Sequence, residues 1–272
     1  MQRSIVRRAR RAVATVLAAC GFVATAGAQS FDHSAFDALL KANVVNGMVN
    51  YDAFRAAPSF PKYLASLAAT SPAALPRDEQ LAFWINAYNA YTIQLIISHH
   101  EKASIRNINK TLFLKLKGPW SEPIATVGGK AYTLDEIEHK VIRPTFKEPR
   151  IHMALVCAAM GCPALRSEAY VAARLSAQLD DQGAAFVIRS PAKNRVDVPG
   201  NTWYHSLIFS LYKEDFGGSV KSAAKYVARW YPDGAEKQFL LGGRFNTHQT
   251  DYDWTLNSQE NFRKTRNPPA AP

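Results

Sequence analysis

Two cysteines, Cys157 and Cys162, stand in the segment IHMALVCAAMGCPAL at residues 151–165 and offer the most reactive chemistry in the chain. Three roles are open to such a pair: a disulfide, two metal ligands, or a thiol nucleophile with its helper. The third cysteine of the sequence, Cys20, lies in an N-terminal segment that we expect to be removed. The role of the pair therefore depends on the compartment and on the side chains that the fold brings beside it.

The N-terminus has the pattern of an export signal. Residues 1–11 hold five arginines and no acid, and an apolar run follows that ends in Ala26-Gly27-Ala28. We therefore assign residues 1–28 to a signal peptide and expect a periplasmic or secreted protein with no transmembrane span after cleavage. The stretch Leu17-Ala18-Ala19-Cys20 also resembles a lipoprotein box, so lipidation of Cys20 is an open alternative.

An oxidising compartment favours a disulfide. In a regular helix a separation of five residues places two side chains about 140° apart, so the bridge requires the chain to turn back between Cys157 and Cys162. So short a loop adds roughly 2 kcal/mol or less of stability through chain entropy. A zinc site would need both cysteines with His139 and His152, but no second half of a zinc motif is present, and we expect no metal and no cofactor.

A thiol nucleophile needs a base within hydrogen-bond reach and a group that orients the base. His152 is badly placed relative to Cys157 in either a strand or a helix. The alternative catalytic set is therefore Cys157 as nucleophile, His139 as general base and Asn86 as the orienting amide. These residue types are similar to the sites of papain-like and transglutaminase-like enzymes. The competing interpretation is that Glu138 and His139 form an ordinary solvated helix end.

A long apolar helix must position these groups. Pro76, followed by Asp78 and Glu79, predicts a helix start. The segment LAFWINAYNAYTIQLII is apolar nearly all round, so we expect a buried central helix that runs to about residue 98. Asn86 and Asn89 share one stripe of this helix; they either cap loop backbone or line a pocket, and we favour the first.

The flanking segments alternate between short helices and short strands. We expect a hairpin at 124–133 that turns at Gly128-Gly129, a helix at 134–142, a buried strand or short helix at 151–157 and a strand at 195–198. Further helices are expected at 31–44, 167–188, 202–212 and 219–231. This pattern indicates one α+β domain over residues 29–257, helix-rich around a small sheet, and a disordered tail over 258–272.

Charge and motif content exclude several function classes. The chain has 33 Lys+Arg and 22 Asp+Glu, and loss of the signal with its five arginines leaves 28 minus 22, or +6. The basic residues are scattered, so no nucleic-acid partner is expected. The absence of GxSxG, HExxH, Walker and dinucleotide motifs removes the common serine hydrolases, zincins, NTPases and Rossmann enzymes.

Five blocks occur in order along the chain: LAFWINAYNAYTI, VGGKAYTLDEIEH, PRIHMALVCAAMGCPAL, WYHSLIFSLYKEDF and DYDWTLN. Together they resemble the DUF547 family, a domain of unknown function, over roughly residues 36–257. The resemblance implies a shared fold and a shared set of polar positions, and it supplies no reaction. In this chain those positions are Asn86, Asn89, Glu138, His139, Arg143, His152, Cys157, Cys162, Trp254 and Asn257.

Two functions from different classes remain open. In the first, which we favour, the protein is a binding or accessory module of the bacterial envelope with an unidentified partner, structural cysteines and a polar interior network of Asn86, His152 and Arg143. In the second, it is a thiol hydrolase or acyltransferase that uses Cys157 on an envelope amide substrate. Trp254 and Asn257 either close over a pocket or anchor the chain in the core.

Overall fold

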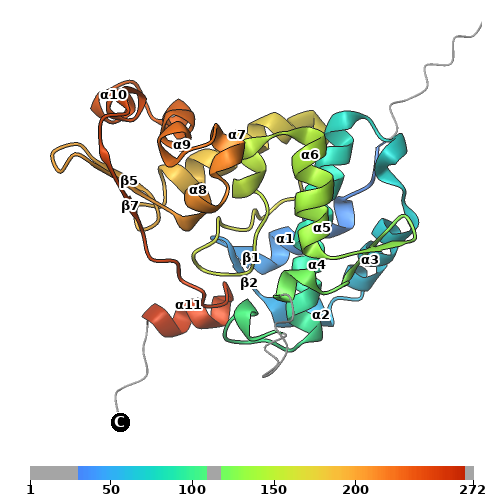
Figure 1. Cartoon of the computed structure of the whole chain (residues 1–272). Coiled ribbons are helices and arrows are strands. Elements are labelled where there is room, and N and C mark those ends of the chain that lie inside the picture. Colours follow the sequence, from blue (N-terminus) through green and yellow to red (C-terminus); the bar gives the residue numbers. More distant parts are fainter. Residues whose placement is uncertain (1–29, 109–117, 267–272) are drawn as a thin grey trace, which may run out of the picture.

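Helix α4 (Arg77–Ser98) runs through the middle of the molecule, as the sequence predicts (Figure 1). Every residue from Leu81 to Ile97 except Gln94 is buried, so the helix is enclosed on all sides. This enclosure is the reason for its apolar composition, because a helix with solvent on one face would carry a polar stripe there. Pro76 and the acids Asp78 and Glu79 mark its start, where acidic side chains interact favourably with the helix dipole.

The structure is a computed structural model that describes residues 30–108 and 118–266. The predicted signal peptide at 1–28, Cys20 and the last six residues of the predicted tail lie outside the described residues. In the part of the chain that is described, no helix combines the length and the hydropathy needed to cross a membrane.

The N-terminal helices cover one side of α4. They are α1 (Ser34–Asn43), α2 (Tyr51–Ala56), α3 (Ser59–Ala69) and the short η1 (Pro72–Ala74), with the hairpin β1 (Val44–Val45) and β2 (Met48–Val49) between α1 and α2. The hairpin turns at Asn46 and Gly47, both with positive φ. A Cβ on Gly47 would lie 2.5 Å from the Cβ of Ala164, so only glycine lets this turn pack against the segment that follows Cys162.

The predicted hairpin at 124–133 is present as β3 (Ala125–Val127) and β4 (Lys130–Tyr132), turning at Gly128 and Gly129. The helix predicted at 134–142 is also present, but it is longer and irregular. It begins as α5 (Leu134–Glu136) with a Thr133–Glu136 capping box, widens into the π-helical segment η4 (Ile137–Ile142), and continues as α6 (Arg143–Phe146). Pro144 is the second residue of α6, and the helix continues past it to Phe146, beyond the end at residue 142 that we predicted.

One further prediction of local structure was half right and another was wrong. Of the two forms expected at 151–157, the strand is absent: the 3₁₀ helix η5 (Pro149–Met153) covers the start of the segment, and an irregular loop follows it. Two other 3₁₀ helices are η2 (Ile105–Asn107) and η3 (Pro119–Ser121). The helix expected at 202–212 is split into β6 (Thr202–His205) and α8 (Leu207–Leu211). In β6 the side chains alternate between the interior and the surface, and Trp203 is fully buried, which is the period of a strand.

A second hydrophobic core is built from the C-terminal half. Strand β6 pairs antiparallel with β5 (Arg195–Asp197), near the strand we predicted, and parallel with β7 (Asn246–Gln249). The helices around this core are η7 (Lys213–Phe216), α9 (Val220–Val227), η8 (Ala228–Trp230) and α10 (Ala235–Gly242). Helix α7 (Leu175–Val187), preceded by η6 (Ala172–Arg174), contributes Leu179 to the first core and Phe186 to the second. The fold is therefore α+β and helix-rich, as predicted.

The chain then returns to the first core. Backbone hydrogen bonds join residues 253–257 to residues 158–161, and the amide of Val49 donates to the carbonyl of Asn257. Helix α11 (Gln259–Arg266) follows, where we had predicted the start of a disordered tail. Buried Leu256, Asn257 and Ser258 hold the segment in place immediately before this helix.

Candidate functional site

Cys157 and Cys162 form a disulfide, with their Cα atoms 6.1 Å apart. The chain turns back directly after Cys157, because Ala158 adopts a left-handed conformation with φ of 59°. A non-glycine residue there costs roughly 1–2 kcal/mol and persists only where its surroundings hold it. The amide of Asn257 donates to the carbonyl of Ala158 at 3.1 Å, and the amide of Met160 donates to the carbonyl of Thr255 at 2.8 Å.

The two sulfur atoms have unequal surroundings. Cys162 is 2% exposed, whereas Cys157 is partly exposed. The backbone N–H of Cys157 donates to Cys162 Sγ at 3.1 Å, and the hydroxyl of Tyr252 lies 3.1 Å from each sulfur. Because a disulfide carries no S–H, Tyr252 is the donor. Burial raises the pKa of Tyr252, so its phenol keeps this proton.

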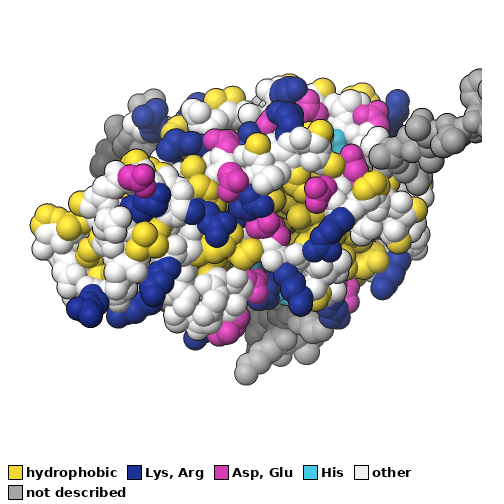
Figure 2. Space-filling model, turned by 90° about the horizontal axis from the view of Figure 1, so that it is seen from above, with side chains coloured by type: hydrophobic (Ala, Val, Ile, Leu, Met, Phe, Trp, Pro, Cys, Tyr) yellow, Lys and Arg dark blue, Asp and Glu magenta, His cyan; other side chains and the backbone are white. Residues whose placement is uncertain are grey.

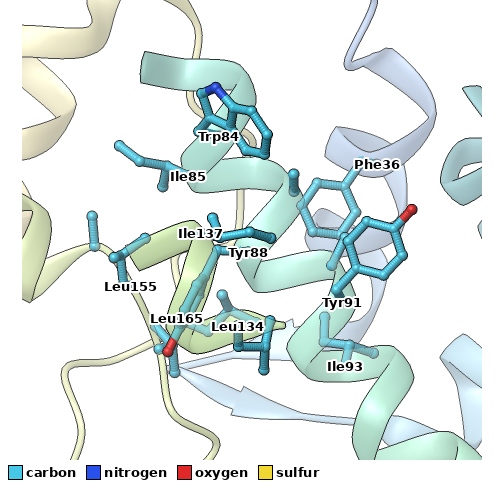
Figure 3. Packing of buried hydrophobic residues seen from close by; sticks show 14 of the residues in the cluster. Phe36, Trp84, Ile85, Tyr88, Tyr91, Ile93, Leu134, Ile137, Leu155 and Leu165 are labelled. Carbon is cyan, nitrogen blue, oxygen red and sulfur yellow. The ribbon is translucent and has the colours of Figure 1, made fainter. Parts of the chain in front are cut away.

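A pocket of about 170 Å³ opens beside the bridge. Its apolar wall includes Leu155, Pro163, Leu207, Ile208 and Leu211, its aromatic wall Tyr88, Trp120, Tyr212, Tyr252 and Trp254, and its polar groups Asp135, Glu138, His139 and His152. Figure 3 shows Tyr88 reaching from α4 past Ile137 toward Leu165, the residue two positions beyond Pro163. The ring centroids of Tyr252 and Trp254 lie 4.6 Å apart, so the two rings form one aromatic surface.

His152 lies between two carboxylates at the polar end of the pocket. Its Nε2 is 2.6 Å from Asp215 Oδ2, and its Nδ1 is 3.7 Å from Glu138 Oε1. The ring also stacks on Tyr212, with centroids 3.9 Å apart. His152 and Glu138 are buried, and the hydrogen bond to Asp215 satisfies the Nε2 atom of His152 there.

Arg143 extends this network to His139. Its guanidinium binds Asp215 through two hydrogen bonds, Nε to Oδ2 at 2.7 Å and Nη2 to Oδ1 at 3.0 Å, and its Nη1 donates to His139 Nδ1 at 2.9 Å. The hydrogen bonds from His152 and Arg143 hold the pKa of Asp215 well below its usual range, so this carboxyl is ionised. Burial and the nearby charge of Glu138 raise the pKa of Tyr212, so that its phenol stays neutral.

The π-helical segment η4 sets the geometry of this network. Glu138 and His139 lie within it, and Arg143 follows directly. A π-helix has a wider turn than an α-helix, so these side chains take directions that regular α-helical spacing would not give them. Such segments occur frequently at functional sites, so this face of the helix is a candidate for one.

Six of the ten positions implied by the resemblance line the pocket. They are Glu138, His139, His152, Cys157, Cys162 and Trp254. Arg143 does not line the pocket, but it binds His139, which does, and Asp215, which in turn binds His152. Asp215 joins His152 to Arg143, whereas Asn86, which we expected in the same network, does not take part in it.

The three asparagines hold loops. Asn86 donates to the carbonyl of Tyr170 at 2.8 Å and accepts from its amide at 2.9 Å. Asn89 donates to the carbonyl of Ala154 at 2.9 Å and accepts from the amide of Val156 at 3.0 Å. Asn257 accepts from the hydroxyl of Tyr51 at 2.6 Å. Asn86 is thus occupied by loop backbone and is not among the residues of the pocket wall, where the catalytic set with Cys157 and His139 would need it.

Sequence reasoning missed Asp215 and gave Tyr212 no role. Both lie in the block WYHSLIFSLYKEDF, so the resemblance signalled this segment but no particular residue. The contact between Asp215 and Arg143 spans 72 positions, and no local spacing predicts it. Among the described residues, no three His, Cys, Asp or Glu side chains are arranged to hold a metal ion.

Comparison with known proteins supports the resemblance. Residues 72–187 match the family model described as "Protein of unknown function, DUF547". The matched segment begins just before α4, ends with α7 and contains the disulfide loop, Glu138, His139 and His152. Tyr212, Asp215, Tyr252 and Trp254 come from the chain that follows it. No curated protein matches the chain, and no solved structure matches it.

Proposed function

We propose that the protein is an exported binding or accessory module of the bacterial envelope, and that its pocket receives a small ligand with an apolar body and a basic group. The observation that carries this proposal is the disulfide in the pocket wall. Both cysteines of the domain are used in it, so no free thiol faces the pocket, and the bridge shapes the wall. Export would supply the oxidising compartment in which such a bridge persists.

The lining determines what fits. Apolar and aromatic side chains form most of the wall, whereas the charged members that the structure describes are the carboxylates Asp135 and Glu138. Arg143, the nearest basic group of the network, is paired with Asp215. An aromatic wall with carboxylates at one end attracts an ammonium or guanidinium group more than an anion. Elsewhere, Figure 2 shows Lys and Arg interspersed with Asp and Glu on the face seen from above.

Three indole compounds of similar size provide the test. Tryptamine carries an ammonium group, indole no charge and indole-3-acetate a carboxylate, and their binding to the mature protein is measured by titration calorimetry. We expect tryptamine to bind most tightly and indole-3-acetate most weakly. Glu138→Gln should reduce the affinity for tryptamine about 5- to 10-fold and leave indole unchanged. Equal binding of all three, or none at all, would contradict the proposal.

Glu236→Gln is the matched control. Glu236 is an exposed carboxylate on α10 that does not line the pocket. The same change of charge at this position should alter no affinity. If both variants lose tryptamine equally, the effect is one of net charge, and the pocket is not the binding site.

A second candidate is the thiol hydrolase or acyltransferase, which is favoured by one observation. His139 and His152 line the same pocket as Cys157, so a base is available to this sulfur once the bridge is opened. The reduced protein would then cleave peptide p-nitroanilides, and the oxidised protein and Cys157→Ser would not. Equal activity of the reduced and oxidised proteins, or none in either, removes this candidate.

A further inference from the structure

We propose that the bridge between Cys157 and Cys162 is a site of thiol–disulfide exchange, and that the ligand of the pocket is a thiol. This inference rests on the proposed function in one respect, because it uses the same pocket to hold the incoming molecule. It goes beyond that function by giving the bridge a chemical role.

The unequal burial of the two sulfurs decides which one is attacked. Cys157 is partly exposed and lines the pocket, whereas Cys162, although it borders the pocket, is 2% exposed. A thiol that enters the pocket therefore reaches Cys157 Sγ first, and exchange rates depend on such access. Cys157 is the sulfur attacked and Cys162 the leaving group.

Two hydrogen-bond donors lie within reach of the leaving sulfur. The backbone N–H of Cys157 lies 3.1 Å from Cys162 Sγ, and the hydroxyl of Tyr252 lies 3.1 Å from it and at the same distance from Cys157 Sγ. Donors of this kind stabilise a thiolate more than a neutral sulfur, and a more stable leaving thiolate departs faster. Asn89 and the 253–257 segment fix the loop on both sides, so these donors need no rearrangement to act.

The step balances without any further reactant. The incoming thiol releases its proton to solvent, and its sulfur forms a bond to Cys157 Sγ. The bond between Cys157 and Cys162 breaks, and its electron pair goes to Cys162 Sγ. The incoming sulfur is oxidised and that of Cys162 is reduced. A second thiol that attacks the mixed disulfide leaves two cysteine thiols on the protein and a disulfide of the ligand.

The test uses the oxidised mature protein and two probes, cysteamine and its uncharged relative N-acetylcysteamine, at equal thiolate concentration. Opening of the bridge in the native protein is followed by acid quench, alkylation and intact mass. We expect Tyr252→Phe to slow opening about 10-fold, because one donor to the leaving sulfur is lost. Tyr204→Phe, the same change on β6 away from the pocket, should leave the rate unchanged.

Single-cysteine variants test the direction of attack. With cystamine, Cys162→Ser should form a mixed disulfide on Cys157, and Cys157→Ser should react on Cys162 at least about 10-fold more slowly. Any one of three outcomes would overturn the inference. The bridge opens only after denaturation, the two cysteines react equally fast, or Tyr252→Phe has no effect on the rate in a protein with an unchanged melting temperature.

The two proposals fail separately. If both probes open the bridge at the same rate and Tyr252→Phe slows both, the exchange stands and the preference for a basic group falls. If tryptamine binds as expected but the native bridge stays closed, the binding function stands and the exchange falls.

Discussion

The ring of His152 stacks on that of Tyr212, with their centroids 3.9 Å apart. His152 belongs to the segment that matches the family model, and Tyr212 belongs to the chain beyond it. Asp215 also belongs to the chain beyond the matched segment, and its Oδ2 lies 2.6 Å from His152 Nε2. The site therefore lies where the two hydrophobic cores meet, and neither half of the chain forms it alone.

Asp215→Asn should destabilise the protein by about 1–3 kcal/mol. The amide would weaken the two bonds to Arg143, leave this cation without its counter-charge and remove one of the two carboxylates beside His152. Urea unfolding followed by circular dichroism measures the effect. Asp233→Asn, on an exposed carboxylate that binds Lys237, is the control and should cause a much smaller loss, because solvent screens this ion pair. Equal losses in the two variants would mean that the network contributes nothing specific.

Stability should fall as the pH falls from about 6.5 to 4, because of His33. This imidazole is buried with one nitrogen bonded to Tyr63 at 2.8 Å, and burial lowers its pKa to about 4. In that range the unfolded chain binds the proton and the folded protein does not, so at pH 5 the loss is about 2 kcal/mol relative to pH 8.

Urea midpoints at pH 8 and pH 5 provide the measurement for His33. His33→Gln removes the titrating group and should lose less stability between the two values than the wild-type protein. His248→Gln, on an exposed histidine of β7, should behave as the wild type. A pH dependence that is identical in all three proteins would show that another group causes it.

Asn89→Ala should destabilise the protein by about 2–4 kcal/mol and expose the disulfide. It leaves Ala154 O and Val156 N buried without partners, immediately before Cys157. Thermal unfolding measures the stability, and the rate at which dithiothreitol opens the native bridge measures the loop. If the stability falls while that rate is unchanged, the asparagine does not position the bridge.

Gly183→Ala and Gly242→Ala form a matched pair with opposite expected signs. A Cβ on Gly183 would enter the ring of Trp230, so the close contact between α7 and η8 would open at a cost of about 2 kcal/mol or more. A Cβ on Gly242 meets nothing within 4 Å, and alanine favours the helix by up to about 1 kcal/mol. Melting temperatures that move in the same direction would contradict this description of the packing.

Periodicity predicted the elements whose burial is uniform. Helix α4 was readable because its apolar residues continue from Leu81 to Ile97, about five turns. The hairpin at Gly128-Gly129 was readable because two glycines between short apolar runs permit few other turns. The segment 151–157 stayed open between strand and helix, and 202–212 was misread, since both are short, apolar runs in which strand and helix give the same pattern. Asn89 of α4 holds the backbone of the first through Ala154 O and Val156 N, a tertiary contact that local pattern does not show.

The residue types of the site could be predicted from the sequence, but the contacts between its residues could not. The segment around Cys157, and the histidines at 139 and 152, stood out because of their chemistry. The π-helical widening at η4 has no sequence signal distinct from an α-helix, and the contact of Arg143 with Asp215 joins residues 72 positions apart. Whether an asparagine lines a pocket or binds loop backbone depends on the direction of its side chain. Sequence spacing alone does not give this direction.

The order of synthesis adds a consequence for the disulfide loop. The ribosome delivers the chain from its N-terminus, and Tyr252 follows Cys162 by 90 residues. The backbone partners of residues 158–161, at 253–257, emerge equally late. Both cysteines are therefore present in the growing chain before the tyrosine and the backing segment that later enclose them. Whenever the bridge forms, its surroundings are completed only when the last stretch of the protein docks.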